Sequence, residues 1–153
     1  MSLVKVKEYF KKYDLDKEII ELDCISATVK QAADALGVEE NQIAKTLAFM
    51  LEEPILIVTS GNAKIDNHKY KEYFGKKAKM IPQDELDALV GHKIGGVCPS
   101  AIKKGIKVYL DKSLKDNEYV YPACGSENSA IKLSIEQLEK YSNYECYIDV
   151  VKD

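Results

Sequence analysis

The chain has 153 residues, of which 46% are hydrophobic and 31% charged, and this length and composition predict a single domain over residues 1–153 with a real core. The net charge of −3 excludes a globally basic nucleic-acid binder, so any nucleic acid must be held by a local patch. The four cysteines form no C-x-x-C pair, neither histidine lies at ligand spacing from them, and no cofactor motif, signal peptide or membrane-length apolar run is found. We therefore expect a cytoplasmic protein with reduced thiols, no metal and no cofactor.

The first half of the chain alternates helical and strand-like patterns. Helical spacing and capping residues predict helices over 4–13, 29–36 and 38–44, and apolar runs predict strands over 18–22, 46–51 and 55–58. The clearest helix has Thr28 as its N-cap and Gly37 as its stop. The last two strands, joined by a short turn, are expected to form a hairpin with the second strand at the centre of a sheet.

The second half shows the same mixture. Predicted helices cover 67–74, with Asp66 as N-cap, 82–90, and a last segment that begins at Ser134; predicted strands cover 78–81, 107–111, 118–123, 130–133 and 145–151. Hairpins and helical crossovers alternate in this order. The sequence therefore predicts an α/β or α+β fold with a mixed sheet and helices packed on it.

Lys45 is the single charged residue of the apolar segment 42–51, at the point where the predicted helix gives way to a strand. A buried ammonium must be paired, have a lowered pKa, or await an anionic partner, and each option is costly enough to suggest a use. The alternative is that Lys45 reaches water from a strand end, which for a lone lysine is the commoner case.

Two loops carry small polar or glycine residues. Residues 59–62 follow the central strand, where α/β proteins often bind ligands, although the same residues suit a plain turn. Residues 95–99 combine two glycines with a proline, so their backbone N–H groups can approach a ligand closely. Ordinary loops need glycine as well, so neither loop identifies a site by itself.

Taken in order along the chain, these motifs resemble the YbaK family of aminoacyl-tRNA deacylases, which is similar to the editing domain of bacterial prolyl-tRNA synthetases. The resemblance rests on the segments 28–38, 42–47, 60–66, 95–99 and 125–126. It implies a mixed, partly barrel-like sheet surrounded by helices, and a free-standing enzyme that hydrolyses mischarged tRNA in trans. The implied substrate is the 3′ end of tRNA for proline carrying a small wrong amino acid such as alanine or cysteine, and a synthetase is a second implied partner.

The resemblance also implies roles for particular residues. Lys45 matches the lysine essential for deacylation, and Gly95 matches the position that orients the attacking water or the ester carbonyl. The matching pocket-wall positions are Thr46, Ser60, Gly61, Gly96, Pro99, Gly125 and Ser126. Water can attack an activated ester when it is positioned beside a cradle for the developing oxyanion, so no nucleophilic triad is required.

Alternatives remain at the level of sequence. A non-catalytic module that binds aminoacyl-tRNA would keep the pocket, and a Schiff-base enzyme would use Lys45 as nucleophile. Cys98 is expected not to be a nucleophile, because only His92 lies near it as a base. Two lysine clusters, 69–79 and 103–107, can meet tRNA phosphates or can simply be solvated faces.

Overall fold

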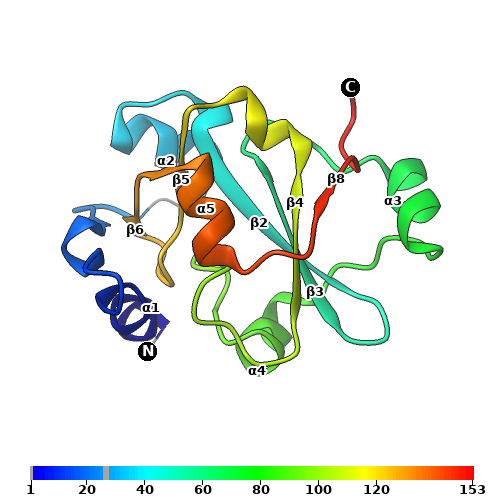
Figure 1. The fold of residues 1–153 in the computed structure, drawn as a ribbon, viewed down its shortest axis with the longest axis horizontal. Coiled ribbons are helices and arrows are strands. Elements are labelled where there is room, and N and C mark those ends of the chain that lie inside the picture. The colour runs from blue at the N-terminus through cyan, green and yellow to red at the C-terminus, as the bar shows by residue number, and fades with distance from the viewer. Residues whose placement is uncertain (1, 26–27) are drawn as a thin grey trace.

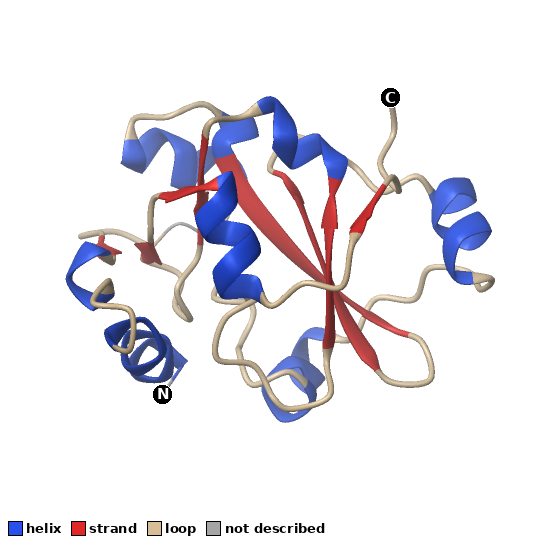
Figure 2. Ribbon diagram, viewed as in Figure 1, coloured by secondary structure: helices blue, strands red, loops and turns tan. Residues whose placement is uncertain are grey.

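The computed structural model describes residues 2–25 and 28–153, which form a curled, half-barrel sheet with helices around it (Figures 1 and 2). The α-helices are α1 (Ser2–Lys11), α2 (Val29–Leu36), α3 (Asn67–Phe74), α4 (Leu86–Leu89) and α5 (Ile135–Ser142). The strands are β1 (Ile20–Glu21), β2 (Ile43–Met50), β3 (Pro54–Ser60), β4 (Lys107–Asp111), β5 (Tyr119–Pro122), β6 (Ser129–Ala130), β7 (Leu133–Ser134) and β8 (Tyr147–Ile148). Within this range, no helix has the length and apolar character to cross a membrane.

The main sheet has the strand order β7-β5-β2-β3-β4-β8, and β1 pairs separately with β6. Its centre is the antiparallel hairpin of β2 and β3, whose register runs from Ala44 opposite Ser60 to Met50 opposite Pro54. β4 joins β3 in parallel, β8 joins β4 in parallel, and β5 joins β2 in parallel. The predicted mixed sheet and central hairpin are therefore confirmed.

Strand alternation divides the apolar side chains between two cores. On one face of β2 and β3, Ala44, Ala48, Leu56 and Val58 belong to the larger core. That core also receives side chains from α1, α4 and α5, and Figure 1 shows α5 lying across this side of the sheet. On the other face, Phe49, Ile55 and Ile57 pack with Tyr70 of α3 in a smaller core. Both faces of the central hairpin are thus covered, which explains why β3 reads as a continuous apolar run.

Local capping chemistry sets four helix boundaries as predicted. Thr28 accepts a hydrogen bond from the Gln31 N–H, and Gly37 ends α2 in the left-handed conformation at φ 71°. Asp66 caps α3 by accepting from two backbone N–H groups. Ser134 and Gln137 form a reciprocal capping box at the start of α5. These interactions lie within a few residues of one another, so the sequence alone specifies them.

The predicted helix over 38–44 is wrong. Only a 3₁₀ turn at Glu40–Gln42 forms, closed by a capping box between Glu39 and Gln42. β2 begins at Ile43, because Ile43 and Ala44 pair with β5 and Ala44 also pairs with Ser60 of β3. These long-range pairings override the helical tendency of the short segment, and Lys45 consequently lies inside a strand rather than at its entrance.

Other segments are more fragmented than predicted. Residues 78–81 form no strand and make only a bridge between Met80 and Phe49. Residues 82–90 divide into a 3₁₀ turn and α4, and 130–133 divides between β6 and β7, which pair with different strands. The strand predicted over 18–22 keeps only Ile20–Glu21, and the one over 145–151 keeps only Tyr147–Ile148. Each short piece pairs with a different segment of the chain, and the periodicity of a sequence does not show which segments will pair.

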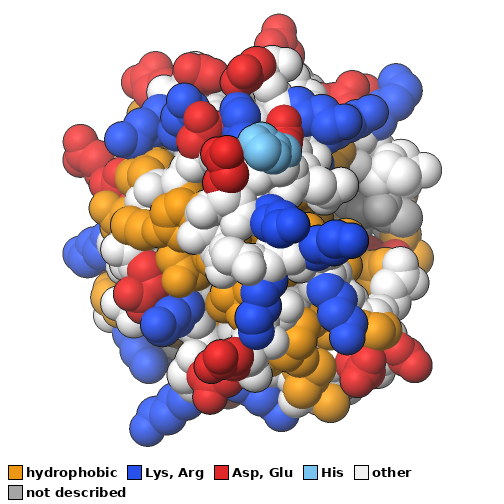
Figure 3. Space-filling view, turned by 90° about the vertical axis from the view of Figure 1, so that its right-hand side faces the viewer, with side chains coloured by type: hydrophobic (Ala, Val, Ile, Leu, Met, Phe, Trp, Pro, Cys, Tyr) orange, Lys and Arg blue, Asp and Glu red, His pale blue; other side chains and the backbone are white. Residues whose placement is uncertain are grey.

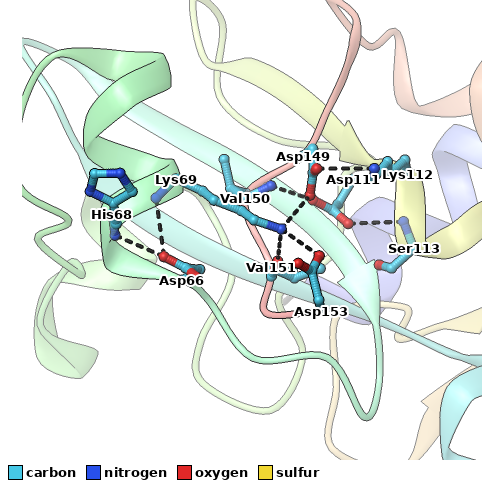
Figure 4. Close-up of polar contacts among 10 residues, drawn as sticks. All are labelled: Asp66, His68, Lys69, Asp111, Lys112, Ser113, Asp149, Val150, Val151 and Asp153. Carbon is cyan, nitrogen blue, oxygen red and sulfur yellow. Dashed lines mark hydrogen bonds and ion pairs between the residues drawn. The ribbon is translucent and has the colours of Figure 1, made fainter.

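A polar cluster anchors the C-terminal segment to β4 and α3 (Figure 4). The carboxylate of Asp111, which is fully buried, accepts from the N–H groups of Ser113 and Val150, both at 2.9 Å. On the exposed side, Lys69 donates to the Val151 carbonyl at 2.8 Å and forms an ion pair with Asp149. The buried carboxylate and the exposed ion pairs therefore hold the same segment by different means.

We predict that Asp111→Ala lowers the free energy of unfolding by about 1–3 kcal/mol, because the buried N–H of Val150 and the partly buried N–H of Ser113 lose their acceptor. The matched control is Asp149→Ala, which removes only partly exposed ion pairs and should cost clearly less. Urea unfolding of both variants measures the difference. Equal losses would contradict the assignment of the anchor to Asp111.

Candidate active site

The site begins with an interruption in the hydrogen bonding along one edge of β2. β5 pairs with this edge only at Ile43 and Ala44. Further along, the Ile81 N–H donates to the Ala48 carbonyl at 3.0 Å, and the Met50 N–H donates to the Lys79 carbonyl at 2.8 Å. No strand among the described residues pairs with the intervening positions 45–47 on this edge. We call this stretch the edge gap.

Thr46 is the residue whose peptide groups face the edge gap. In a strand, the N–H and C=O of alternate residues point to the same edge. Ala48 and Met50 direct theirs toward the segment 79–81, so the N–H and C=O of Thr46 point the same way. On the opposite edge, the ladder to β3 continues without a break through Thr46 and Val58. The gap is therefore a local opening in an otherwise rigid strand.

A cavity of about 300 Å³ lies over the edge gap. α2 contributes Val29, Ala32 and Leu36 to the lining. The loop after α4 and the segment around β6 contribute the rest of the facing lining: Ile94, Gly95, Val97, Ser126, Ser129 and Ala130. Ile81 and Leu86 close the cavity at one end, and the exposed side chains of Met80 and Ile94 stand at its mouth. The cavity is mostly apolar with a few polar side chains, which is the usual composition of a small-molecule site.

Lys45 lines this cavity as a half-buried cation. Its Nζ donates to the carbonyl of Ala63 at 2.6 Å, and no ion pair among the described residues includes it. Burial lowers the pKa of Lys45, and the nearby positive charge of Lys64 lowers it further. An ammonium held by a single carbonyl keeps two donors available for an anionic or carbonyl ligand.

Gly95 lines the same cavity from the opposite wall. Its φ of 86° favours glycine, and a Cβ at this position would collide with Cγ of Glu127. Glu127 was not singled out by the sequence, because nothing in its local pattern indicates that its side chain lies against the glycine loop. Its Oε1 lies 3.3 Å from the position that such a Cβ would occupy, which places a carboxylate beside the loop.

Two further residues singled out by the sequence also line the cavity, Thr46 and Ser126. The Ser126 hydroxyl is 2.9 Å from Oδ1 of Asn128 and 2.6 Å from Oγ of Ser129, so its hydrogen bonds are made within the wall. The Thr46 hydroxyl is buried and has no hydrogen-bond partner among the described residues. Of the two hydroxyls, only that of Ser126 is thus bonded within the described chain.

The other predicted wall residues do not line the cavity, and three of them are glycines at close backbone contacts. A Cβ on Gly61 would collide with the Glu40 carbonyl, and a Cβ on Gly96 would collide with the backbone of Gly125. Gly125 itself, at φ 90°, passes the backbone of Ser2. At these three positions, chain segments pass so closely that no side chain fits between them. Packing therefore explains why these residues are glycines.

Ser60 and Pro99 also lie away from the cavity. The Ser60 hydroxyl donates to the Asn41 carbonyl at 2.8 Å, and its N–H donates to the Ser113 hydroxyl at 3.1 Å. Pro99 is buried beside the glycine loop. Both residues support the elements that carry the cavity rather than its surface.

Cys98 and His92 form a buried pair outside the cavity lining. The Cys98 Sγ is 3.6 Å from Nε2 of His92, and this Nε2 lies 2.7 Å from the Ser100 carbonyl, to which it donates. Burial raises the pKa of Cys98 to about 12 and lowers that of His92. A neutral imidazole that is already donating to a carbonyl, beside a protonated thiol, is not the arrangement of a cysteine nucleophile.

The chemistry open to the cavity follows from its lining. Among the described residues that line it, none is acidic, a histidine or a cysteine. Within the same part of the chain, no three such side chains gather where they could hold a metal ion. The cavity instead offers an ammonium, hydroxyls and free strand peptide groups. This set suits the binding and polarisation of a small polar ester or amide.

The curled mixed sheet, with a cavity against the open edge of its central strand, defines an α/β protein with a ligand-sized site at the edge of β2. The family model for the aminoacyl-tRNA editing domain matches residues 26–141. The chain therefore belongs to the aminoacyl-tRNA editing domain family.

Relatives and solved structures agree with this assignment. The chain is 46% identical to YwhH of Bacillus subtilis (strain 168), an uncharacterized protein, over 100% of this chain and 99% of that one. It is 28% identical to a candidate Cys-tRNA(Pro)/Cys-tRNA(Cys) deacylase, EbsC of Enterococcus faecalis (strain ATCC 700802 / V583), over 76% of this chain and 73% of that one. A crystal structure of a candidate trans-editing enzyme for prolyl-tRNA synthetase superposes with a TM-score of 0.89 at 25% identity, covering 99% of this chain and 98% of that one.

We predict that Gly95→Ala lowers turnover of the substrate by about 10- to 100-fold, because the added methyl group displaces Glu127 or intrudes on the cavity mouth. The matched control is Gly105→Ala. Gly105 has a similar φ of 88°, but a Cβ there meets nothing within 4 Å. Turnover and thermal melting of both variants separate the cavity effect from backbone strain. Equal turnover in the two variants would show that the Gly95 loop is only structural.

Proposed function

We propose that the protein is a free-standing deacylase that hydrolyses mischarged tRNA in trans, with tRNA for proline carrying alanine or cysteine as its substrate. The observation that carries the proposal is the edge gap, where Lys45 and Gly95 line the same small cavity. Membership of the editing family supports the reaction class. The names of EbsC and of the trans-editing enzyme support the link to tRNA for proline.

In the proposed reaction, water adds to the ester carbonyl carbon and the bond from that carbon to the ribose oxygen breaks. The ribose oxygen takes a proton, and the products are a free amino acid and tRNA with a free 3′ end. An ester of this kind is already activated, so the protein needs to position water and stabilise the developing oxyanion. Gly95 lies where its backbone can be approached without hindrance from a side chain.

Lys45 has the free donors that such a reaction requires. Its ammonium can leave the Ala63 carbonyl or share its remaining donors with the anionic 3′ end or with the carbonyl oxygen. The cavity is largely apolar, and a charge acts more strongly there than in water. The Schiff-base alternative is disfavoured, because the described cavity lining offers no acidic residue or histidine as its acid or base.

We predict that Lys45→Met reduces turnover by about 100- to 1000-fold, the usual cost of losing one donor to the oxyanion. The variant should nevertheless melt at the same or a higher temperature. Burial lowers the folded-state pKa of Lys45, so the charged form is disfavoured by folding. The free-energy cost of burying the charged ammonium is present at neutral pH, and it declines only as the pH rises through the lowered pKa of Lys45.

Single-turnover deacylation and thermal melting, both measured from about pH 6 to about pH 9, test the Lys45 prediction. Lys64→Met is the matched control, since Lys64 is exposed and stands beside Lys45 without lining the cavity. Turnover near the wild-type value in Lys45→Met would remove this lysine from the mechanism. Wild-type protein that binds the substrate without turnover would favour the non-catalytic module.

The first lysine cluster, 69–79, ends next to a residue that lines the cavity. Lys79 directly precedes Met80 at the cavity mouth, and Lys77 is its exposed neighbour on the same segment. Neither residue is among the ion pairs of the described chain. Figure 3 shows the side of the molecule on which α3 lies, where lysine side chains are interspersed with acidic ones. We therefore propose that the segment 76–79 contacts tRNA phosphates while the 3′ end enters the cavity.

We predict that Lys77→Ala/Lys79→Ala weakens tRNA binding and lowers the slope of log affinity against log salt by about 1–2, since each phosphate contact contributes roughly 0.7–0.9. Lys103→Ala/Lys104→Ala makes the same change of charge in the other cluster and should alter the slope less. Fluorescence anisotropy over a salt series with labelled tRNA provides the measurement. A larger effect from the second pair would move the tRNA surface to that cluster.

A further inference from the structure

His92 is a buried polar residue that the proposed reaction does not use. Its side chain is fully buried, and its Nδ1 has no hydrogen-bond partner among the described residues. A leucine would fill a similar volume without burying an unpaired nitrogen, so the imidazole carries a free-energy cost that packing does not explain. The reason for a histidine at this position therefore lies with Nε2, the ring nitrogen that has a partner.

Nε2 of His92 closes the base of the glycine loop, residues 95–99. It lies 2.7 Å from the carbonyl oxygen of Ser100, and because a carbonyl only accepts, Nε2 carries the proton and donates. His92 and Ser100 flank the segment that contains the loop, so this buried bond ties the two ends of the segment together. Gly95 and Val97 of the same segment line the cavity, whereas His92 does not. His92 can therefore act on a ligand only through the loop.

The backbone directly after Ser100 is strained. Ala101 has a φ of 55°, in the left-handed region that a residue with a Cβ seldom adopts. The other non-glycine residues with positive φ in the described chain are Asp14 and Asn143, whose residue types tolerate that region better. The φ rotation of Ala101 adjoins the peptide group of the Ser100 carbonyl and so sets the direction of that carbonyl. A strained conformation persists only where the surrounding structure holds it, and the bond from His92 is one such restraint.

The other hydrogen bonds of the loop do not replace this restraint. The N–H and the carbonyl of Gly96 each take part in a backbone bond of 3.0 Å, which holds the middle of the loop rather than its base. The Cys98 Sγ is 3.6 Å from the Ser100 carbonyl, and a thiol is only a weak donor. The next backbone bond outward joins residues 90 and 103, beyond the strained alanine. At the base of the loop, the imidazole is therefore the strong donor.

We propose that His92 is a positioning residue for the reaction: by donating to the Ser100 carbonyl, it fixes the base of the glycine loop and keeps Gly95 in place at the cavity. The inference rests on the proposed function and adds to it a residue outside the cavity. A displacement of about 1 Å in a reacting group can cost about 100-fold in rate. Loss of the bond is expected to lower kcat and leave KM little changed, because the rest of the cavity lining is retained.

The experiment measures kcat and KM separately for tRNA for proline carrying alanine or cysteine. His92→Leu, which removes the donor, is expected to lower kcat about 10- to 100-fold and to change KM by less than about threefold. His92→Gln places an amide N–H near the position of Nε2 and should recover at least about tenfold of that loss. The matched control is Tyr9→Phe, which removes another 2.7 Å bond from a side chain to a backbone carbonyl, away from the cavity. A wild-type kcat in His92→Leu, or equal losses in His92→Leu and His92→Gln, overturns the inference.

A second measurement separates this inference from the deacylase proposal. Amide hydrogen exchange of residues 93–97, measured without substrate, is expected to be at least about tenfold faster in His92→Leu than in the wild type and unchanged in Tyr9→Phe. Unchanged exchange in folded His92→Leu overturns the inference. Absence of hydrolysis by the wild type would defeat the deacylase, while the exchange rates would still decide whether His92 holds the loop. Thermal melting checks folding, and His92→Phe takes the place of His92→Leu if that variant does not fold.

Discussion

The structure depends on a break in hydrogen bonding along one edge of its central strand. β2 keeps a complete ladder with β3 and stays rigid, but on its other edge β5 departs after Ala44 and the next partner begins at Ala48. Strand peptide groups left without a partner are costly unless water or a ligand reaches them. The gap therefore requires a cavity, and the elements that surround the gap supply its walls.

The position of the cavity explains why a charged residue is retained in an apolar strand. Lys45 has a lowered pKa because burial disfavours its charge, and Lys64 adds to that effect. A methyl-ended side chain would suit the strand better if stability alone were at issue. The ammonium meets a carbonyl rather than a carboxylate, so its charge is solvated but not neutralised. This combination is suited to a site that must attract a polyanionic molecule.

Glycines near the site fall into two groups with different physical reasons. Gly95 faces the cavity, and its positive φ and its contact with Glu127 fix the shape of the wall. Gly61, Gly96 and Gly125 instead allow backbone segments to pass each other closely. A side chain at any of these three would push apart elements that hold the cavity in shape. Glycines that the sequence marks as one kind of site residue therefore act in two ways: one lines the cavity, and the others hold together the elements around it.

The sequence by itself determined features that depend on neighbours in the chain. The caps at Thr28, Asp66 and Ser134, the apolar hairpin, and the exceptional position of Lys45 all follow from local chemistry and periodicity. The resemblance to the editing family added the partly barrel-like form of the sheet and the residues to inspect.

Tertiary structure decided what distant segments do to one another. Pairing with β3 and β5 turned the predicted helix end at Ile43 into a strand, and the segment around Met80 became an edge partner of β2 without forming a strand. The lack of a partner for the Thr46 hydroxyl, and the carboxylate of Glu127 beside Gly95, exist only once these segments meet. Such contacts join residues far apart in the chain, and no local pattern of side chains encodes their register.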